Sequence, residues 1–147
     1  MVVCFSKLTN TAITPTQAHT SDAGFDLYAD LGEIDKIEVI DPNEMHKVST
    51  GINIAIPPGY FGGIYARSGL ATKKGLRLAN DVGVIDSPYR GEVIVALYND
   101  SPAPQEIRHG DRIAQLIIHP IPIVTLKEVD HLDETDRGGG GFGSTGS

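Results

Sequence analysis

The C-terminal end of the chain combines glycine, hydroxyl, aromatic and arginine side chains. Residues 137–147 read Arg-Gly-Gly-Gly-Gly-Phe-Gly-Ser-Thr-Gly-Ser. Glycines let backbone N–H groups turn inward and form a concave nest for phosphate oxygens. Phe142 is suited to covering a base and Arg137 to neutralising negative charge. No lysine precedes Ser144 and Thr145, so this is not a P-loop. Composition alone would also fit an unstructured tail.

Two segments in the first half of the chain carry residues that suit a metal and an anion. Asp22 and Asp26 lie among small residues and could hold Mg²⁺ directly or through water, since hard cations prefer carboxylate oxygen. The alternative is a pair of solvated acids at the start of a strand. Arg67-Ser68-Gly69 opens a short predicted helix, where free N–H groups and a guanidinium would bind an anion. Its alternative is an N-cap serine beside a surface arginine.

Residues 80–93 predict a hairpin followed by a turn into a buried strand. Asp86 ends an apolar run, so we expect it to be partly desolvated and able to act as a general base. Pro88 and Tyr89 would then form a rigid turn that holds an aromatic ring near the acid. Asp86 is alternatively a simple turn former, a role that Asp-Ser-Pro performs well.

Gln115 interrupts an otherwise apolar run at 112–118. A buried glutamine has four hydrogen-bonding positions to satisfy, so it is either bonded in the core or presented to a ligand. Asp111 and Arg112, just before it, are expected to form a structural pair at a turn.

Charge and composition limit the partners. The 147 residues carry 19 acidic groups against 12 Lys and Arg, a net charge of −7. This balance argues against non-specific nucleic-acid binding, which depends on Lys and Arg. It would also repel a polyphosphate unless a divalent cation and placed arginines reverse the local sign. No apolar run is long enough to span a membrane, and no signal peptide is expected. Cys4 is the only cysteine, so a reducing compartment fits best.

The elements that would position these residues are mostly short strands. Strands are expected at 34–40, 52–56, 92–98, 112–119 and 121–126, with 92–98 and 112–119 buried on both faces. A helix is expected only at Ser68–Lys74, ended by Gly75. This pattern indicates an all-β sandwich, jelly roll or barrel. Residues 128–136 carry five acids and no Lys or Arg, which is typical of a solvated hinge.

Taken in order, the five segments strongly resemble the motifs of the trimeric dUTP pyrophosphatase (dUTPase) family, from Ser21 almost to the C-terminus. The resemblance implies a distorted jelly-roll or β-barrel core at 1–127, with one short helix. It also implies an acidic hinge and Gly-rich arm at 128–147. Members assemble as homotrimers with three shared sites. One subunit would supply Arg67-Ser68-Gly69 and Gln115, a second the 80–89 segment, and a third the arm, which closes a neighbour's site.

The implied activity is Mg²⁺-dependent hydrolysis of dUTP to dUMP and pyrophosphate, which limits uracil in DNA and supplies dUMP. Asp86 would position and deprotonate the water that attacks the α-phosphorus, and Asp26 would anchor Mg²⁺ through water. Tyr89 would lie against the deoxyribose and reject UTP. The remaining substrate-binding residues implied are Arg67, Ser68, Gly69, Asn80, Gly83, Val84, Ile85, Gln115, Arg137, Phe142, Gly143, Ser144 and Thr145. The expected location is the cytoplasm, or the nucleus if the source is eukaryotic or viral. Neither nucleic acid nor membrane is an expected partner.

Two positions depart from the family pattern. Ala66 stands where Pro is usual before Arg67, and Pro88 replaces an acidic or small residue, removing one N–H. Two alternatives stay open. A dCTP deaminase of the same superfold would need a glutamate where this chain has Asp86, and a catalytically silent relative would act as a binding or regulatory protein.

Overall fold

The computed structural model describes residues 1–141, which form ten β-strands and one short helix. The strands are β1 (Cys4–Lys7), β2 (Phe25–Tyr28), β3 (Ile37–Ile40), β4 (Met45–Ala55), β5 (Tyr60–Tyr65), β6 (Leu76–Leu78), β7 (Gly83–Ile85), β8 (Glu92–Asn99), β9 (Gln105–Arg108) and β10 (Arg112–Pro120). The helix, η1, spans Leu70–Lys74.

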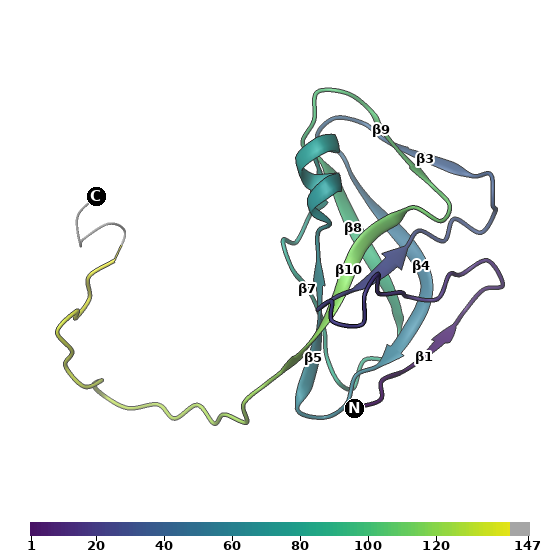
Figure 1. Cartoon of the computed structure of the whole chain (residues 1–147). Coiled ribbons are helices and arrows are strands. Elements are labelled where there is room, and N and C mark those ends of the chain that lie inside the picture. Colours follow the sequence, from purple (N-terminus) through teal and green to yellow (C-terminus); the bar gives the residue numbers. More distant parts are fainter. Residues whose placement is uncertain (142–147) are drawn as a thin grey trace.

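Two four-stranded antiparallel sheets and one two-stranded sheet make up the body (Figure 1). The strand orders are β1-β4-β8-β6 and β2-β10-β5-β7, and β3 pairs with β9. This all-β, jelly-roll-like arrangement confirms the fold class predicted from the spacing of short strands.

The core lies between the inner faces of the sheets. Val48 and Val95 come from one sheet, and Leu27, Ile64 and Leu116 come from the other; all are almost fully buried. Because antiparallel sheets bury one face and leave the other toward solvent, side chains alternate along each strand. The expectation that residues 92–98 are buried on both faces is therefore wrong, since Val93, Val95 and Leu97 are buried while Ile94 is 48% exposed.

The predicted helix is present, but it begins at Leu70 rather than Ser68. It is also a π-helix, which has more residues per turn than an α-helix and is therefore wider. Gly75 has φ 67°, and its N–H donates to the carbonyl of Leu70, five residues earlier. The left-handed conformation ends the helix at the residue expected, because glycine adopts it without steric cost.

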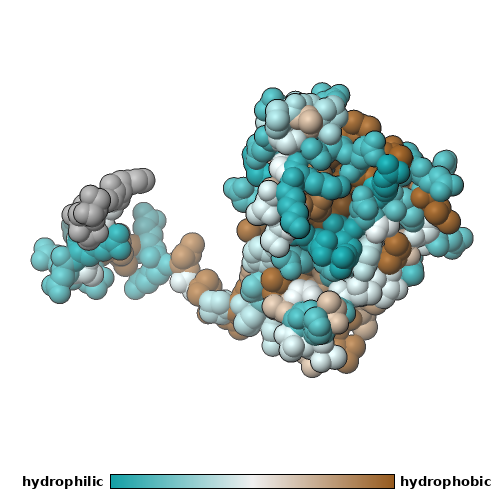
Figure 2. Space-filling model, turned by 45° about the horizontal axis from the view of Figure 1, so that its top comes forward, coloured by the Kyte–Doolittle hydropathy of each residue, from teal (hydrophilic) through white to brown (hydrophobic). Residues whose placement is uncertain are grey.

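The chain leaves the body after Pro120 (Figure 1). The strand expected at 121–126 is not formed, because in one chain this segment has no sheet edge beside it; Ile123 and Leu126 are almost fully exposed. Figure 2 shows apolar atoms open along the stretch that extends from the body. Within residues 1–141, no helix is long and apolar enough to cross a membrane.

Candidate functional site

The first of two hollows on the body, here called the polar hollow, has a volume of about 510 Å³. Its wall is polar and comes from residues far apart in the sequence. The lining residues are Ala18, Asp22, Ala23, Gly24, Asp26, Arg67, Ser68, Gly69, Arg112 and Gln115. The structure thus brings together three of the five segments singled out in the sequence.

Strand register explains why these residues meet. Gln115 on β10 lies opposite Asp26 on β2 and opposite Tyr65 on β5. Paired residues of adjacent strands project from the same face of a sheet. Arg67 follows β5 by two residues, so it reaches the same end of this sheet.

Asp26 lies between two arginines. Its Oδ1 is 2.8 Å from Arg67 Nε and its Oδ2 is 3.2 Å from Arg112 Nη1, while only 16% of its side chain is exposed. Arg112 was expected to pair with Asp111. That expectation is wrong, because Asp111 Oδ2 instead accepts the backbone N–H of Arg108 at the turn.

Gln115 is both bonded and presented to the hollow. Its Nε2 donates to the carbonyl of Ala66 at 3.2 Å, which connects the amide to the residue before Arg67. Gly24 leaves room for it, since a Cβ there would lie 3.0 Å from Gln115 Oε1. The two readings that the sequence left open are therefore compatible.

The remaining residues of this hollow come from a helix start and a turn. Ser68 does not cap η1, whose N-cap is Gly69 and which has no side-chain cap. Asp22 Oδ2 accepts the backbone N–H of His19 at 2.9 Å, so this carboxylate supports a local turn as well as lining the hollow.

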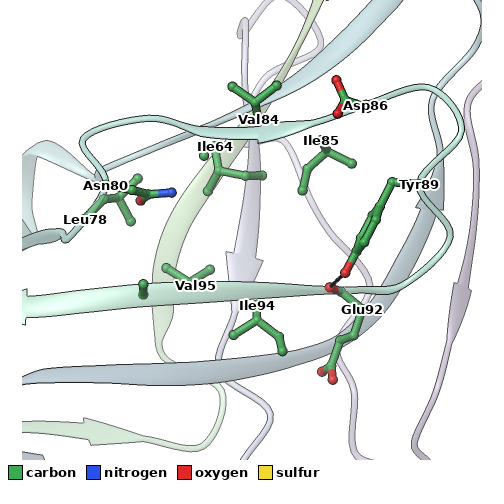
Figure 3. Close-up of a pocket in the computed structure, with 12 residues that line it drawn as sticks. Ile64, Leu78, Asn80, Val84, Ile85, Asp86, Tyr89, Glu92, Ile94 and Val95 are labelled. Atoms are coloured by element: carbon green, nitrogen blue, oxygen red, sulfur yellow. Dashed lines mark hydrogen bonds between the residues drawn. The ribbon is translucent and has the colours of Figure 1, made fainter.

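The second hollow, here called the β7 hollow, has a volume of about 270 Å³ and combines apolar side chains with polar groups. Figure 3 shows it between the segment that carries β7 and strand β8, with Asn80 toward one end and Tyr89 toward the other. The lining residues are Ile64, Leu78, Asn80, Gly83, Val84, Ile85, Asp86, Tyr89, Glu92, Ile94, Val95 and Ala96. None of these lines the polar hollow.

The segment at 80–93 does not pair with itself as the predicted hairpin would. Strand β7 pairs with β5, whereas β6 and β8 pair in the other sheet. Asp81, with φ 57°, turns the chain between the two sheets. Because β7 ends its sheet, one row of its backbone N–H and C=O groups is not used by a strand and can bind a ligand.

A tight turn holds Asp86 and Tyr89. The N–H of Tyr89 donates to the carbonyl of Asp86 at 3.0 Å, and Ser87 Oγ donates to the carbonyl of Ile56 at 3.0 Å. The turn thus accommodates Pro88. Within one chain Asp86 is exposed, so the expected partial desolvation is wrong for the isolated subunit. Figure 3 shows why: Asp86 projects from the side of β7 that carries Val84, away from Ile85.

Asp30 is buried two residues after the end of β2 and lines neither hollow. Burial raises the pKa of this carboxyl group, but hydrogen bonds from Thr9, Thr11 and the N–H of Gly32 outweigh it and hold the pKa below its usual value. His109 Nδ1 accepts the N–H of Leu31 at 3.2 Å and lies 3.6 Å from Asp30 Oδ1. The cluster connects the N-terminal segment to the loop that leads into β10.

Among the predicted residues of the arm, the structure describes only Arg137, which lines neither hollow. Arg137 is exposed, and its Nε donates to the carbonyl of Gly140 at 2.9 Å in a local turn. Four further predicted residues lie outside the described part of the chain: Phe142, Gly143, Ser144 and Thr145.

Sequence reasoning missed Arg112 and Glu92, which line the polar and β7 hollows. The available signal was their position, because each opens a strand that carries or adjoins a predicted site residue. Residues 1–141 contain no group of three or more His, Cys, Asp or Glu side chains arranged to hold a metal. A metal bound at Asp26 would therefore take most of its ligands from water or substrate.

Comparison with known proteins identifies relatives over most of the chain. A family model described as dUTPase matches residues 10–146. The deoxyuridine 5'-triphosphate nucleotidohydrolase of Nocardia farcinica is 48% identical over 133 residues, which cover 90% of this chain and 78% of that protein. The protein of the same name from Desulfitobacterium hafniense is 49% identical and covers 90% and 86%.

Solved structures of dUTPases are also similar to this chain. A Staphylococcus bacteriophage 80alpha dUTPase variant solved with dUpNHpp superimposes with a TM-score of 0.89 at 28% identity, covering 99% of both chains. A dUTPase variant from phage phi11 of S. aureus, in which a structural Mg(II) ion is coordinated, gives 0.81 at 26% identity and covers 91% of this chain and all of that one.

Proposed function

Because this chain belongs to the dUTPase family and is a dUTP nucleotidohydrolase, we propose that its two hollows are the two halves of the site that converts dUTP to dUMP and pyrophosphate. The observation that carries the proposal is that the two hollows offer different chemical groups to a ligand. One hollow combines apolar side chains with a free backbone edge, as a nucleoside requires, and the other holds two arginines, as phosphates require. The relatives described above are dUTPases, and none is a deaminase.

In the β7 hollow, the unpaired backbone edge of β7 and the amide of Asn80 would read O2, N3–H and O4 of uracil. A pocket built from such hydrogen bonds rejects cytosine by roughly 10⁴-fold, because mispaired buried donors remain unsatisfied. The close approach of β7 to C5 would exclude the thymine methyl group. Tyr89 would lie against the deoxyribose and leave no room for a 2′-hydroxyl.

Asp86 would be the general base. Its carboxylate accepts a proton from a water molecule as the water oxygen attacks the α-phosphorus. The bond from the α-phosphorus to the bridging oxygen breaks, and pyrophosphate leaves with the electron pair. Since Asp86 is exposed in one chain, a neighbouring subunit and the arm would have to cover it to exclude bulk water.

In the polar hollow, Arg67, Ser68, Gly69 and Gln115 would bind the phosphates. Arg67 is already oriented by Asp26 at 2.8 Å, so substrate would meet a guanidinium held in place. Gln115, fixed by the carbonyl of Ala66, would add a neutral donor.

The residues present fit a Mg²⁺ ion that arrives with the triphosphate. Asp26 offers a carboxylate in the polar hollow, and Mg²⁺ typically combines one or two protein carboxylates with water and substrate phosphates. When bound, the ion supplies neutralisation of phosphate charge. Asp26 would anchor it through water, and the arginines on both sides of Asp26 limit the excess of negative charge.

We propose a homotrimer, with core 1–127 and arm 128–147, in which each site is shared. The two hollows of one chain have no lining residue in common, so subunits would have to bring together the polar hollow of one and the β7 hollow of another. The exposed apolar segment 121–126 would pack on a neighbour and direct the arm to its site. There Arg137, Ser144 and Thr145 would hold the γ-phosphate, and Phe142 with Gly143 would cover the uracil.

Mixing two inactive variants tests this. D86N and R67A subunits, unfolded together and refolded, would form mixed trimers in which about a quarter of the sites combine an intact Asp86 with an intact Arg67. Pyrophosphate release from dUTP should return to that level. If both residues served one site within one chain, mixing would restore nothing. Absence of pyrophosphate with the unaltered protein would defeat the activity itself.

A further inference from the structure

Glu92 stands at the first position of β8, in the wall of the β7 hollow, and has no role in the proposed mechanism. Figure 3 shows its backbone turned toward Tyr89 and its carboxylate turned away from the hollow, toward the neighbouring strand. Both the carboxylate and the main-chain carbonyl of Glu92 accept hydrogen bonds.

The carboxylate of Glu92 closes an irregularity in the sheet. The pairing of β4 with β8 shifts between Ser49, opposite Ile94, and Asn53, opposite Glu92 itself. A bulge of this kind leaves ladder donors without a strand partner. Glu92 Oε1 supplies the missing acceptor: it accepts the buried N–H of Gly51 at 2.8 Å and the hydroxyl of Ser49.

The main-chain carbonyl of the same residue holds the tyrosine. Tyr89 Oη donates to Glu92 O at 2.9 Å. The ring lies directly over Gly91, where a Cβ would come within 2.4 Å of Tyr89 Oη. The orientation of the ring thus depends on where β8 begins, and the Glu92 carboxylate ties that point to β4.

We propose that Glu92 is a positioning residue that sets the discrimination between deoxyribose and ribose through Tyr89. This rests on the proposed function, in which the Tyr89 ring lies against the sugar. A ring held at both ends leaves no space for a 2′-hydroxyl, whereas a ring released from Glu92 O can move aside. Displacements near 1 Å change rates by up to roughly 10²-fold.

The test is the ratio of kcat/KM for dUTP to that for UTP, measured on one preparation so that the fraction of active protein cancels. E92A should lower the ratio about tenfold. E92Q should keep it within about twofold, because both bonds fall on one oxygen that an amide also has. Y89F should lower it as E92A does, and the E92A/Y89F double variant should lower it no further. E106A, which removes an exposed Glu106–Arg108 pair, is the matched control and should change nothing.

An unchanged ratio in E92A, or additive effects in the double variant, would overturn the proposal for Glu92. If E92A fails to fold, S49A removes only the serine bond and should shift the ratio in the same direction by a smaller factor; no shift would count against the proposal. Y89A distinguishes a failure of the proposal for Glu92 from a failure of the proposed role of Tyr89. A ratio unchanged in Y89A would instead defeat the proposed role of Tyr89.

Discussion

The polar hollow and the β7 hollow place functional groups in opposite ways. In the polar hollow, charged side chains meet across adjacent strands and hold one another, as Asp26 holds Arg67 and Arg112. In the β7 hollow, an edge strand offers its backbone, and the side chains of Asn80 and Tyr89 stand at the two ends. Side chains that carry charge suit a ligand defined by charge, and a backbone edge suits one defined by a hydrogen-bonding pattern. Substitutions in the two hollows should therefore change different properties of one reaction.

The largest effect is expected at Asp86. D86N removes the proton acceptor but keeps the shape of the turn, so kcat should fall by roughly 10²–10⁴-fold while dUTP still binds. Pyrophosphate release gives kcat, and calorimetry with a non-hydrolysable dUTP analogue gives the affinity. Undiminished turnover would remove Asp86 from the role of base and leave the two hollows as binding sites only.

A smaller loss is expected at Arg67. Lysine cannot reproduce the planar fork of the guanidinium, so R67K should lower kcat/KM by roughly 10- to 10²-fold. Because both substrates carry the same triphosphate, dUTP and UTP should be affected by the same factor. Steady-state kinetics with both nucleotides measures this. A change in the ratio of kcat/KM for dUTP to that for UTP would contradict the assignment of phosphate binding to the polar hollow and sugar discrimination to the β7 hollow.

The opposite signature is expected from Gly91. A Cβ there would lie 2.4 Å from Tyr89 Oη, so G91A must displace the ring. The dUTP to UTP ratio should fall about tenfold with little change in Mg²⁺ requirement. G24A is the matched variant in the polar hollow, where the tightest contact of the added Cβ is Gln115 Oε1 at 3.0 Å, the end of a flexible side chain. It should raise KM a few-fold and leave the ratio unchanged.

The smallest effect on turnover at neutral pH is expected from Asp30, which connects the N-terminal segment to the loop before β10 and lines neither hollow. Its folded-state pKa lies below the ordinary value of 3.8. The stabilisation is therefore complete above pH 3.8 and is lost as pH falls through the lower folded value. D30N should lose about 1–3 kcal/mol of unfolding free energy at pH 7 and depend less steeply on pH below 4. Urea unfolding at pH 7 and pH 3 measures both, and equal pH dependence in the two proteins would rule the contribution out.

How well the sequence predicted each element depended on how much of its signal was local. Strands β8 and β10 are long apolar runs and were predicted within one residue of their ends. Strand β5 was missed because Gly62 and Gly63 weaken its pattern. A strand was expected at 121–126 from composition alone, although a strand also needs a neighbour.

The site followed the same rule. Grouping Asp26, Arg67 and Gln115 depended on resemblance to a family, since they are brought together only by strand pairing. Arg112 was assigned the adjacent acid as its partner, but the turn before β10 directs that acid to Arg108 instead. The position of Glu92 at the start of a predicted strand was visible in the sequence, but its contacts were not, because its partners follow from an irregular register between β4 and β8.

Strand register places Asp26, Gln115 and Tyr65 side by side across β2, β10 and β5. The polar hollow therefore forms only when β10 is correctly aligned. If β10 slipped by one residue, every side chain on it would change face, so Leu116 would enter the polar hollow and the amide would enter the core. Such a misfolded molecule would be compact and yet inert. Catalytic competence in this protein thus reports correct strand alignment as well as intact chemistry.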